Sequence, residues 1–130
     1  MKNVGMHKEL RCTYDEALTR VTEALKTEGF GVLTEIDVKE TLKKKIDVDF
    51  RRYKILGACN PPFAHRALQT DLQAGLLMPC NVVVYENDEQ RATVMAVDPM
   101  QTIAMAGKPE LTELATEVRA KLERALGRLE

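Results

Sequence analysis

Tryptophan is absent from this sequence, and only 5% of its 130 residues are aromatic. Proteins that bind nucleic acids usually carry an excess of basic charge, and those that bind single strands also stack bases on aromatic side chains. Here 19 basic and 20 acidic residues give a formal net charge of −1. The one basic run, Lys43–Lys45, is followed at once by Asp47 and Asp49, which is typical of a solvated helix end. The sequence therefore predicts no nucleic-acid partner.

Long apolar runs are also missing. No stretch approaches the roughly 18 apolar residues that indicate a membrane span, so we expect no membrane partner. The first ten residues lack the apolar core and small-residue cleavage site of a signal peptide. The three cysteines are an odd number in a chain large enough to fold without disulfides, which points to a reducing compartment. We therefore predict a cytoplasmic protein.

The common catalytic and cofactor motifs are absent too. The chain has no glycine-rich phosphate loop after a strand, and no Gly-x-Ser-x-Gly, Cys-x-x-Cys or His-Glu-x-x-His. These absences argue against the common nucleotidases, hydrolases, thioredoxins and zinc peptidases. They predict no cofactor, and they leave open whether the chain is an enzyme.

What the sequence does contain is a clear hydrophobic pattern for one α+β domain over residues 1–130. Thr13 and Glu16 form a capping box that opens a helix, and Gly29 ends it. Asp37 caps a second, short helix, and Pro109 opens the last and most regular one. Alternating apolar residues predict strands between the helices, and the run of valines at 82–84 indicates a central strand. The predicted order is β-α-β-α-β-α-β-β-α-α, in one mixed sheet with helices packed mainly on one face.

Two Cys-Asn pairs stand out, because each lies beside a proline at a predicted strand end. Cys59 also precedes a helix N-terminus, where the partial positive charge favours a thiolate. The simpler interpretation is that the thiols pack as small apolar groups and that Asn60 caps the helix begun by Pro61. The candidate ligand-binding residues are Cys59, Asn60, His65, Cys80 and Asn81.

A metal site at these residues is weakly supported. Cys59, His65 and Cys80 supply three donors, which is enough for an open zinc site, but their spacing matches no known pattern. If the strands ending at Cys59 and beginning at Cys80 were parallel, a helical crossover would place the two thiols at opposite ends of the sheet. The sequence therefore predicts no metal.

Three segments carry a resemblance to a known family. They are Gly-Phe-Gly-Val-Leu-Thr-Glu-Ile-Asp-Val from Gly29, Tyr-Lys-Ile-Leu-Gly-Ala-Cys-Asn-Pro-Pro from Tyr53, and Gly-Leu-Leu-Met-Pro-Cys-Asn-Val-Val-Val-Tyr-Glu from Gly75. Together they resemble the bacterial and archaeal "domain of unknown function 302" family over nearly the whole chain. The resemblance implies a compact α+β domain, often a dimer, in cytoplasmic proteins. It supplies no accepted activity and no catalytic residue, but it places Cys59, Asn60, Cys80 and Asn81 in the family pattern.

Two functional hypotheses follow. The first is a non-catalytic small-molecule-binding or interaction module, assembled as a homodimer, with a pocket at the ends of the third and fourth strands. The apolar last helix and the valine-rich strand also favour a dimer, because they leave an apolar surface to be covered. The alternative is a thiol-dependent enzyme, or a sulfur or redox handler, that uses Cys59.

Overall fold

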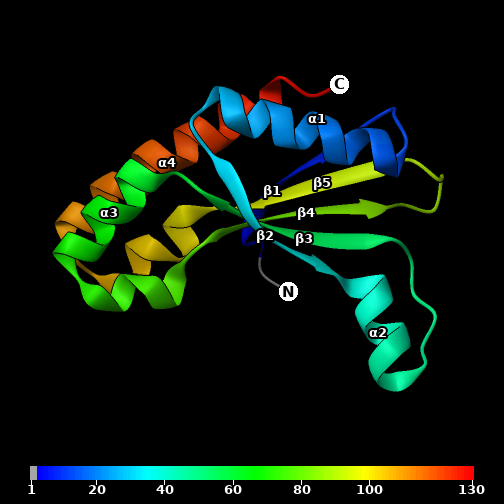
Figure 1. Cartoon of the computed structure of the whole chain (residues 1–130). Helices are drawn as coiled ribbons and strands as arrows, with labels where there is room; N and C mark the ends of the chain where they lie inside the picture. The colour runs from blue at the N-terminus through cyan, green and yellow to red at the C-terminus, as the bar shows by residue number, and fades with distance from the viewer. Residues whose placement is uncertain (1–2) are drawn as a thin grey trace.

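The computed structural model describes residues 3–130 as a five-stranded sheet with two long helices against one of its faces (Figure 1). The strands are β1 (Gly5–Glu9), β2 (Gly31–Asp37), β3 (Tyr53–Cys59), β4 (Cys80–Glu86) and β5 (Ala92–Val97). The helices are α1 (Tyr14–Thr27), α2 (Val38–Ile46), α3 (Pro61–Thr70) and α4 (Pro109–Gly127), with 3₁₀ turns η1 (Leu72–Leu77), η2 (Pro99–Gln101) and η3 (Ile103–Ala106). The predicted α+β class and element order are confirmed. Within the described chain, no helix is long and apolar enough to cross a membrane.

The prediction of a mixed sheet is wrong, because all four neighbouring strand pairs in the order β1-β5-β4-β3-β2 are antiparallel. A parallel connection needs a helix that crosses the sheet and returns the chain to its starting end. Here α2 projects beyond the sheet at one end and α3 at the other, so each connection re-enters at the end it left (Figure 1). As a result, the end of β3 and the start of β4 lie side by side, with Ala58 opposite Cys80.

Local capping explains where two of the helices begin. The Thr13 hydroxyl accepts a hydrogen bond from the Glu16 amide at 3.2 Å, and the Glu16 carboxylate accepts one from the Thr13 amide at 3.4 Å. This confirms the predicted capping box. Asp37 likewise accepts a hydrogen bond from the Glu40 amide at 3.0 Å. Asn60 is the N-cap residue of α3, as predicted, but its side chain makes no capping hydrogen bond and donates instead to the Glu28 carbonyl at 3.0 Å.

The main core lies between the sheet and helices α1 and α4. β4 is the middle strand, as predicted, and its helix-facing residues Val82 and Val84 are almost fully buried, like Leu122 of α4. A second, smaller core lies under α3, η1, η3 and the first half of α4. The apolar pattern after Pro61 predicts that Leu68 and Leu72 point inward, but they are 36% and 85% exposed. The helical period does not reach Leu72, because α3 ends at Thr70 and η1 begins a new turn.

Candidate functional site

A hollow opens where β3 ends, β4 begins, and α3 and α4 pass the end of the sheet. Its cavity volume is about 40 Å³, and its mouth is open to solvent. Apolar side chains dominate its surface, and Cys59 and Cys80 both line it. The lining residues are Phe30, Ala58, Cys59, Asn60, Phe63, Ala64, Met78, Pro79, Cys80, Ile103, Leu114 and Val118.

Strand register decides which of the residues of β4 reach the hollow. Cys80 lies opposite Ala58, so it shares the helix-facing side of the sheet with the buried Val82. Asn81 lies opposite Gly57 on the other side of the sheet and is exposed. The second Cys-Asn pair is therefore split between the two faces of the sheet.

Gly57 lets two segments approach the end of β3 closely. A Cβ at this position would overlap the Thr34 hydroxyl of β2 and lie 2.9 Å from Pro79 Cγ. Any other residue type would require the Thr34 side chain or Pro79 to shift. The glycine therefore lets both pack closely against β3, on the side of the sheet opposite Cys80.

Asn60 joins this end of the sheet to α1. Its side chain is 8% exposed, and its Nδ2 donates to the carbonyl of Glu28, the residue that ends α1. The buried Glu28 carboxylate accepts hydrogen bonds from Arg124 at 3.0 Å and Arg128 at 3.4 Å. Burial acts to raise the pKa of Glu28, but these two arginines outweigh it and hold the pKa below its ordinary value. Asn60 and Glu28 together tie α1, α3 and α4 around the hollow.

The structure brings together three of the five predicted site residues. Cys59, Asn60 and Cys80 line the hollow, whereas His65 is exposed on α3 and does not line it. Asn81 faces the other side of the sheet. The sequence pattern missed the contribution of Ile103 and of the helix residues Phe63, Leu114 and Val118. Their apolar spacing indicates core positions, and nothing in it distinguishes the wall of a hollow from a filled core.

Burial governs the protonation of the two thiols. It raises the pKa of Cys59 above the ordinary thiol value, and it raises the pKa of Cys80 to about 11, with a smaller contribution from the charge of Cys59. The helix N-terminus after Cys59 supplies only about 0.3–1 kcal/mol in favour of a thiolate. Desolvation outweighs that contribution, so both thiols are neutral at pH 7. Among residues 3–130, no three His, Cys, Asp or Glu side chains are grouped so that they could hold a metal ion.

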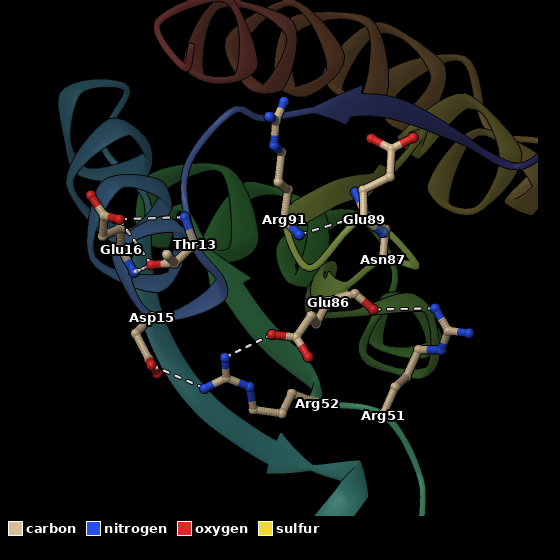
Figure 2. A network of polar contacts seen from close by, with 9 residues as sticks. All are labelled: Thr13, Asp15, Glu16, Arg51, Arg52, Glu86, Asn87, Glu89 and Arg91. Atoms are coloured by element: carbon tan, nitrogen blue, oxygen red, sulfur yellow. Dashed lines mark hydrogen bonds and ion pairs between the residues drawn. The ribbon is translucent and has the colours of Figure 1, made fainter.

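A polar network occupies the opposite end of the sheet (Figure 2). Arg52 contacts the carboxylates of Asp15 at 3.0 Å and Glu86 at 2.8 Å, and its guanidinium lies 4.8 Å from the centre of the Tyr14 ring. The hydrogen bonds to Glu86 and Asp15 raise the pKa of Arg52, and burial raises the pKa of Tyr14 to about 12. Arg52 is therefore charged and Tyr14 neutral at pH 7. The network holds α1, β4 and the start of β3 together.

The molecule is thus an α+β protein with an open-faced antiparallel sheet and an apolar hollow, containing two neutral thiols, at one end of that sheet. The profile of the family "Domain of unknown function DUF302" matches residues 6–129, so the chain belongs to this family and the predicted resemblance is confirmed. A crystal structure of an uncharacterized conserved DUF302 protein from Bacillus stearothermophilus is 32% identical. The similarity covers 98% of each chain, with a TM-score of 0.90. No curated protein matches the chain.

Proposed function

We propose that this protein is a non-catalytic module that binds a small molecule in the hollow between Cys59 and Cys80. The observation that carries the proposal is an apolar space at a strand end, walled by residues of β3, α3, β4, η3 and α4 and bordered by one polar side chain, that of Asn60. Small-molecule sites have this composition, with mostly apolar walls and few polar groups that fix orientation. The ligand would present an apolar group small enough to enter between Phe63, Ile103 and Val118.

Asn60 is the residue proposed to orient the ligand. Its Nδ2 is occupied by the Glu28 carbonyl, while its Oδ1 accepts no hydrogen bond from any residue of the described chain. A hydrogen-bond donor on the ligand would therefore find an acceptor at the edge of the hollow. Cys59 and Cys80 would contact the ligand as neutral, polarisable apolar groups.

Xenon provides a direct probe of the hollow, because apolar cavities in proteins take up xenon. We expect xenon to shift the NMR resonances of Cys59, Cys80 and Phe63. Ala64→Leu fills the hollow from α3 and should abolish the shifts, whereas Ala120→Leu, on the exposed side of α4, should leave them intact. The proposal fails if xenon does not perturb these resonances, or if it perturbs them equally in both variants.

A thiol-dependent enzyme using Cys59 is the second candidate, supported by the presence of two thiols at one hollow. It requires a thiolate at neutral pH. Alkylation by iodoacetamide across a pH series, quantified for each cysteine by mass spectrometry, separates the two candidates. A Cys59 that titrates below the ordinary thiol pKa favours the enzyme, and one that titrates at or above it favours the binding module.

We also propose that the module is a cytoplasmic homodimer. The exposed apolar surface of the sheet supports the dimer, and the three cysteines without disulfide bonds fit a reducing compartment. Sedimentation equilibrium at micromolar concentration is the measurement that checks the assembly, and a monomer there would contradict it.

A further inference from the structure

Charged residues of the strands lie mostly on the helix-covered side of the sheet, the reverse of the usual arrangement. An antiparallel sheet with one covered face usually turns apolar residues toward the helices and charged residues toward water. Here most charged strand residues lie on the side of α1 and α4. Their side follows from their partners on the neighbouring strands, which are core residues or one another. These residues are Lys8, Glu35, Asp37, Lys54 and Glu86.

The other side of the sheet, here called the open face, has an apolar centre, with His7, Thr34 and Asn81 around it. Its central residues are the half-buried Val83 of β4 and its neighbours Ile55 and Met95, which pair with it directly. Tyr53 and Tyr85 stack beside them with ring centroids 5.7 Å apart. The remaining apolar residues of the open face are Ile36 and Val97. Glu9 is the only carboxylate that the described strands turn to this side, and it lies on the edge strand β1.

A second uncovered apolar surface adjoins the open face. The arm, defined as residues 38–50, comprises α2 and the segment after it, and it stands apart from α1 and α4 (Figure 1). None of the residues of α2 is buried, and Ile46, Val48 and Phe50 are 62%, 41% and 41% exposed. The Phe50 ring lies 6.1 Å from that of Tyr53, so the arm and the open face are continuous. An isolated helix of this length is marginal in water, so a packing partner for the arm would stabilise it.

We propose that the open face and the arm together bind a second copy of this chain, in a symmetric dimer. This inference rests on the proposed homodimer and assigns its interface. Five strands spaced about 4.8 Å apart and some 20 Å long give the open face roughly 400 Å² in projection. A stable interface buries about 800 Å² on each partner, so the partner must also contact an adjoining apolar surface. The arm is the surface that adjoins it.

Charge complementarity supports a second copy and orients it. Glu9, Thr93, Tyr85 and Tyr53 form one row across the sheet, at the end where β2 enters α2. A two-fold axis parallel to the strands sets the β1 edge of each copy opposite the β2 edge of the other. Glu9 then faces the arm of the second copy. In that arm Lys43 and Lys44 pair with Asp47, Asp49 and Glu40, and Lys45 has no ion pair within the described residues, so Lys45 is the cation proposed to meet Glu9. The near-zero net charge of the chain adds little repulsion between copies.

Sedimentation equilibrium from about 0.1 to 100 μM tests the interface. Val83→Lys places an unpaired charge at the centre of the open face and should raise the dimer Kd by about 100-fold or more. Ile46→Glu on the arm should weaken the dimer about tenfold, because it removes an apolar contact. The matched control is Leu76→Lys in η1, where an 82% exposed leucine lies away from the sheet, and its Kd should be unchanged. Circular dichroism verifies that each variant folds.

A charge exchange tests the orientation. Glu9→Lys and Lys45→Glu should each weaken the dimer several-fold, and the double variant should recover affinity, because the pair is restored across the interface. No recovery in the double variant overturns the orientation.

The outcomes separate this inference from the homodimer proposal. A wild-type monomer at 100 μM overturns both. A wild-type dimer whose Kd is unaffected by Val83→Lys overturns the assigned interface alone. If Val83→Lys does not fold, Val83→Cys replaces it: its maleimide labelling should slow as protein concentration rises, while labelling of Leu76→Cys stays constant. Equal labelling of the Val83→Cys protein at all concentrations overturns the interface.

Discussion

The two ends of the sheet hold together chain segments that are distant in sequence, and they do so by different means. At one end, Arg52 bridges Asp15 and Glu86, and every charged group in the contact has a partner (Figure 2). At the other end, Cys59 and Cys80 line an apolar hollow with space left between its walls. At the polar end, the charged groups form their ion pairs within the chain. At the apolar end, side chains that line the hollow lack van der Waals contacts on one side, and a ligand could supply them.

The two ends should also respond differently to substitution, salt and pH. The ion pairs are partly exposed, so water and salt can replace much of what they contribute. Water cannot replace the close contacts around Gly57 or relieve the desolvation that raises the pKa of the half-buried Cys80 thiol. We therefore expect larger effects of substitution and of pH at this end of the sheet than at the polar network.

The largest effect is expected for Gly57→Val. The added side chain overlaps Thr34 and meets Pro79, so we expect the free energy of unfolding to fall by about 3 kcal/mol. Gly31→Val on the neighbouring strand is the matched control, because nothing lies within 4 Å of a Cβ there, and its effect should stay within about 0.5 kcal/mol. Urea unfolding followed by circular dichroism measures both. Equal effects of the two substitutions would show that the close approach at Gly57 is unimportant.

The next effect is a loss of stability at alkaline pH that depends on Cys80. The pKa of this thiol is about 11 in the folded protein and 9.0 as an ordinary thiol. Between these values the unfolded chain loses its proton first, so the free energy of unfolding falls as pH rises, by on the order of 2 kcal/mol at pH 11. Cys80→Ala should lack this part of the decline, while Tyr14, with a pKa near 12, contributes equally in both proteins. Parallel stability curves from pH 9 to 11 would contradict the prediction.

The smallest effect is expected at the polar end. Arg52→Ala removes two ion pairs and the contact with Tyr14, and should lower the free energy of unfolding by about 1 kcal/mol. Arg51→Ala breaks an ion pair with Asp88, which is 90% exposed, and should cost less than about 0.5 kcal/mol. Thermal unfolding at low and high salt measures both. A larger loss for Arg52→Ala than for Gly57→Val would reverse the comparison between the two ends.

Local chemistry in the sequence was sufficient to predict the elements. The capping box of Thr13 and Glu16, the cap at Asp37 and the central position of the valine-rich strand are all present in the structure. The same reasoning placed Asn60 correctly at the N-cap of α3 but not its side chain, which donates to the carbonyl of Glu28, 32 residues away. A local pattern cannot reveal that a distant carbonyl holds the side-chain amide away from the local N–H donors.

For the candidate site, the sequence by itself determined that two cysteines lie at strand ends, because hydrophobic periodicity and the prolines mark where strands β3 and β4 stop and start. Only the tertiary structure decided that these ends are adjacent, since connections through α2 and α3 are compatible with either strand direction until the helices are placed. The same placement decided that His65 and Asn81 lie outside the hollow. It also set the charge states of the thiols, because the pKa of Cys80 depends on how much of its surroundings is removed from water, and segments from the whole chain contribute to that burial.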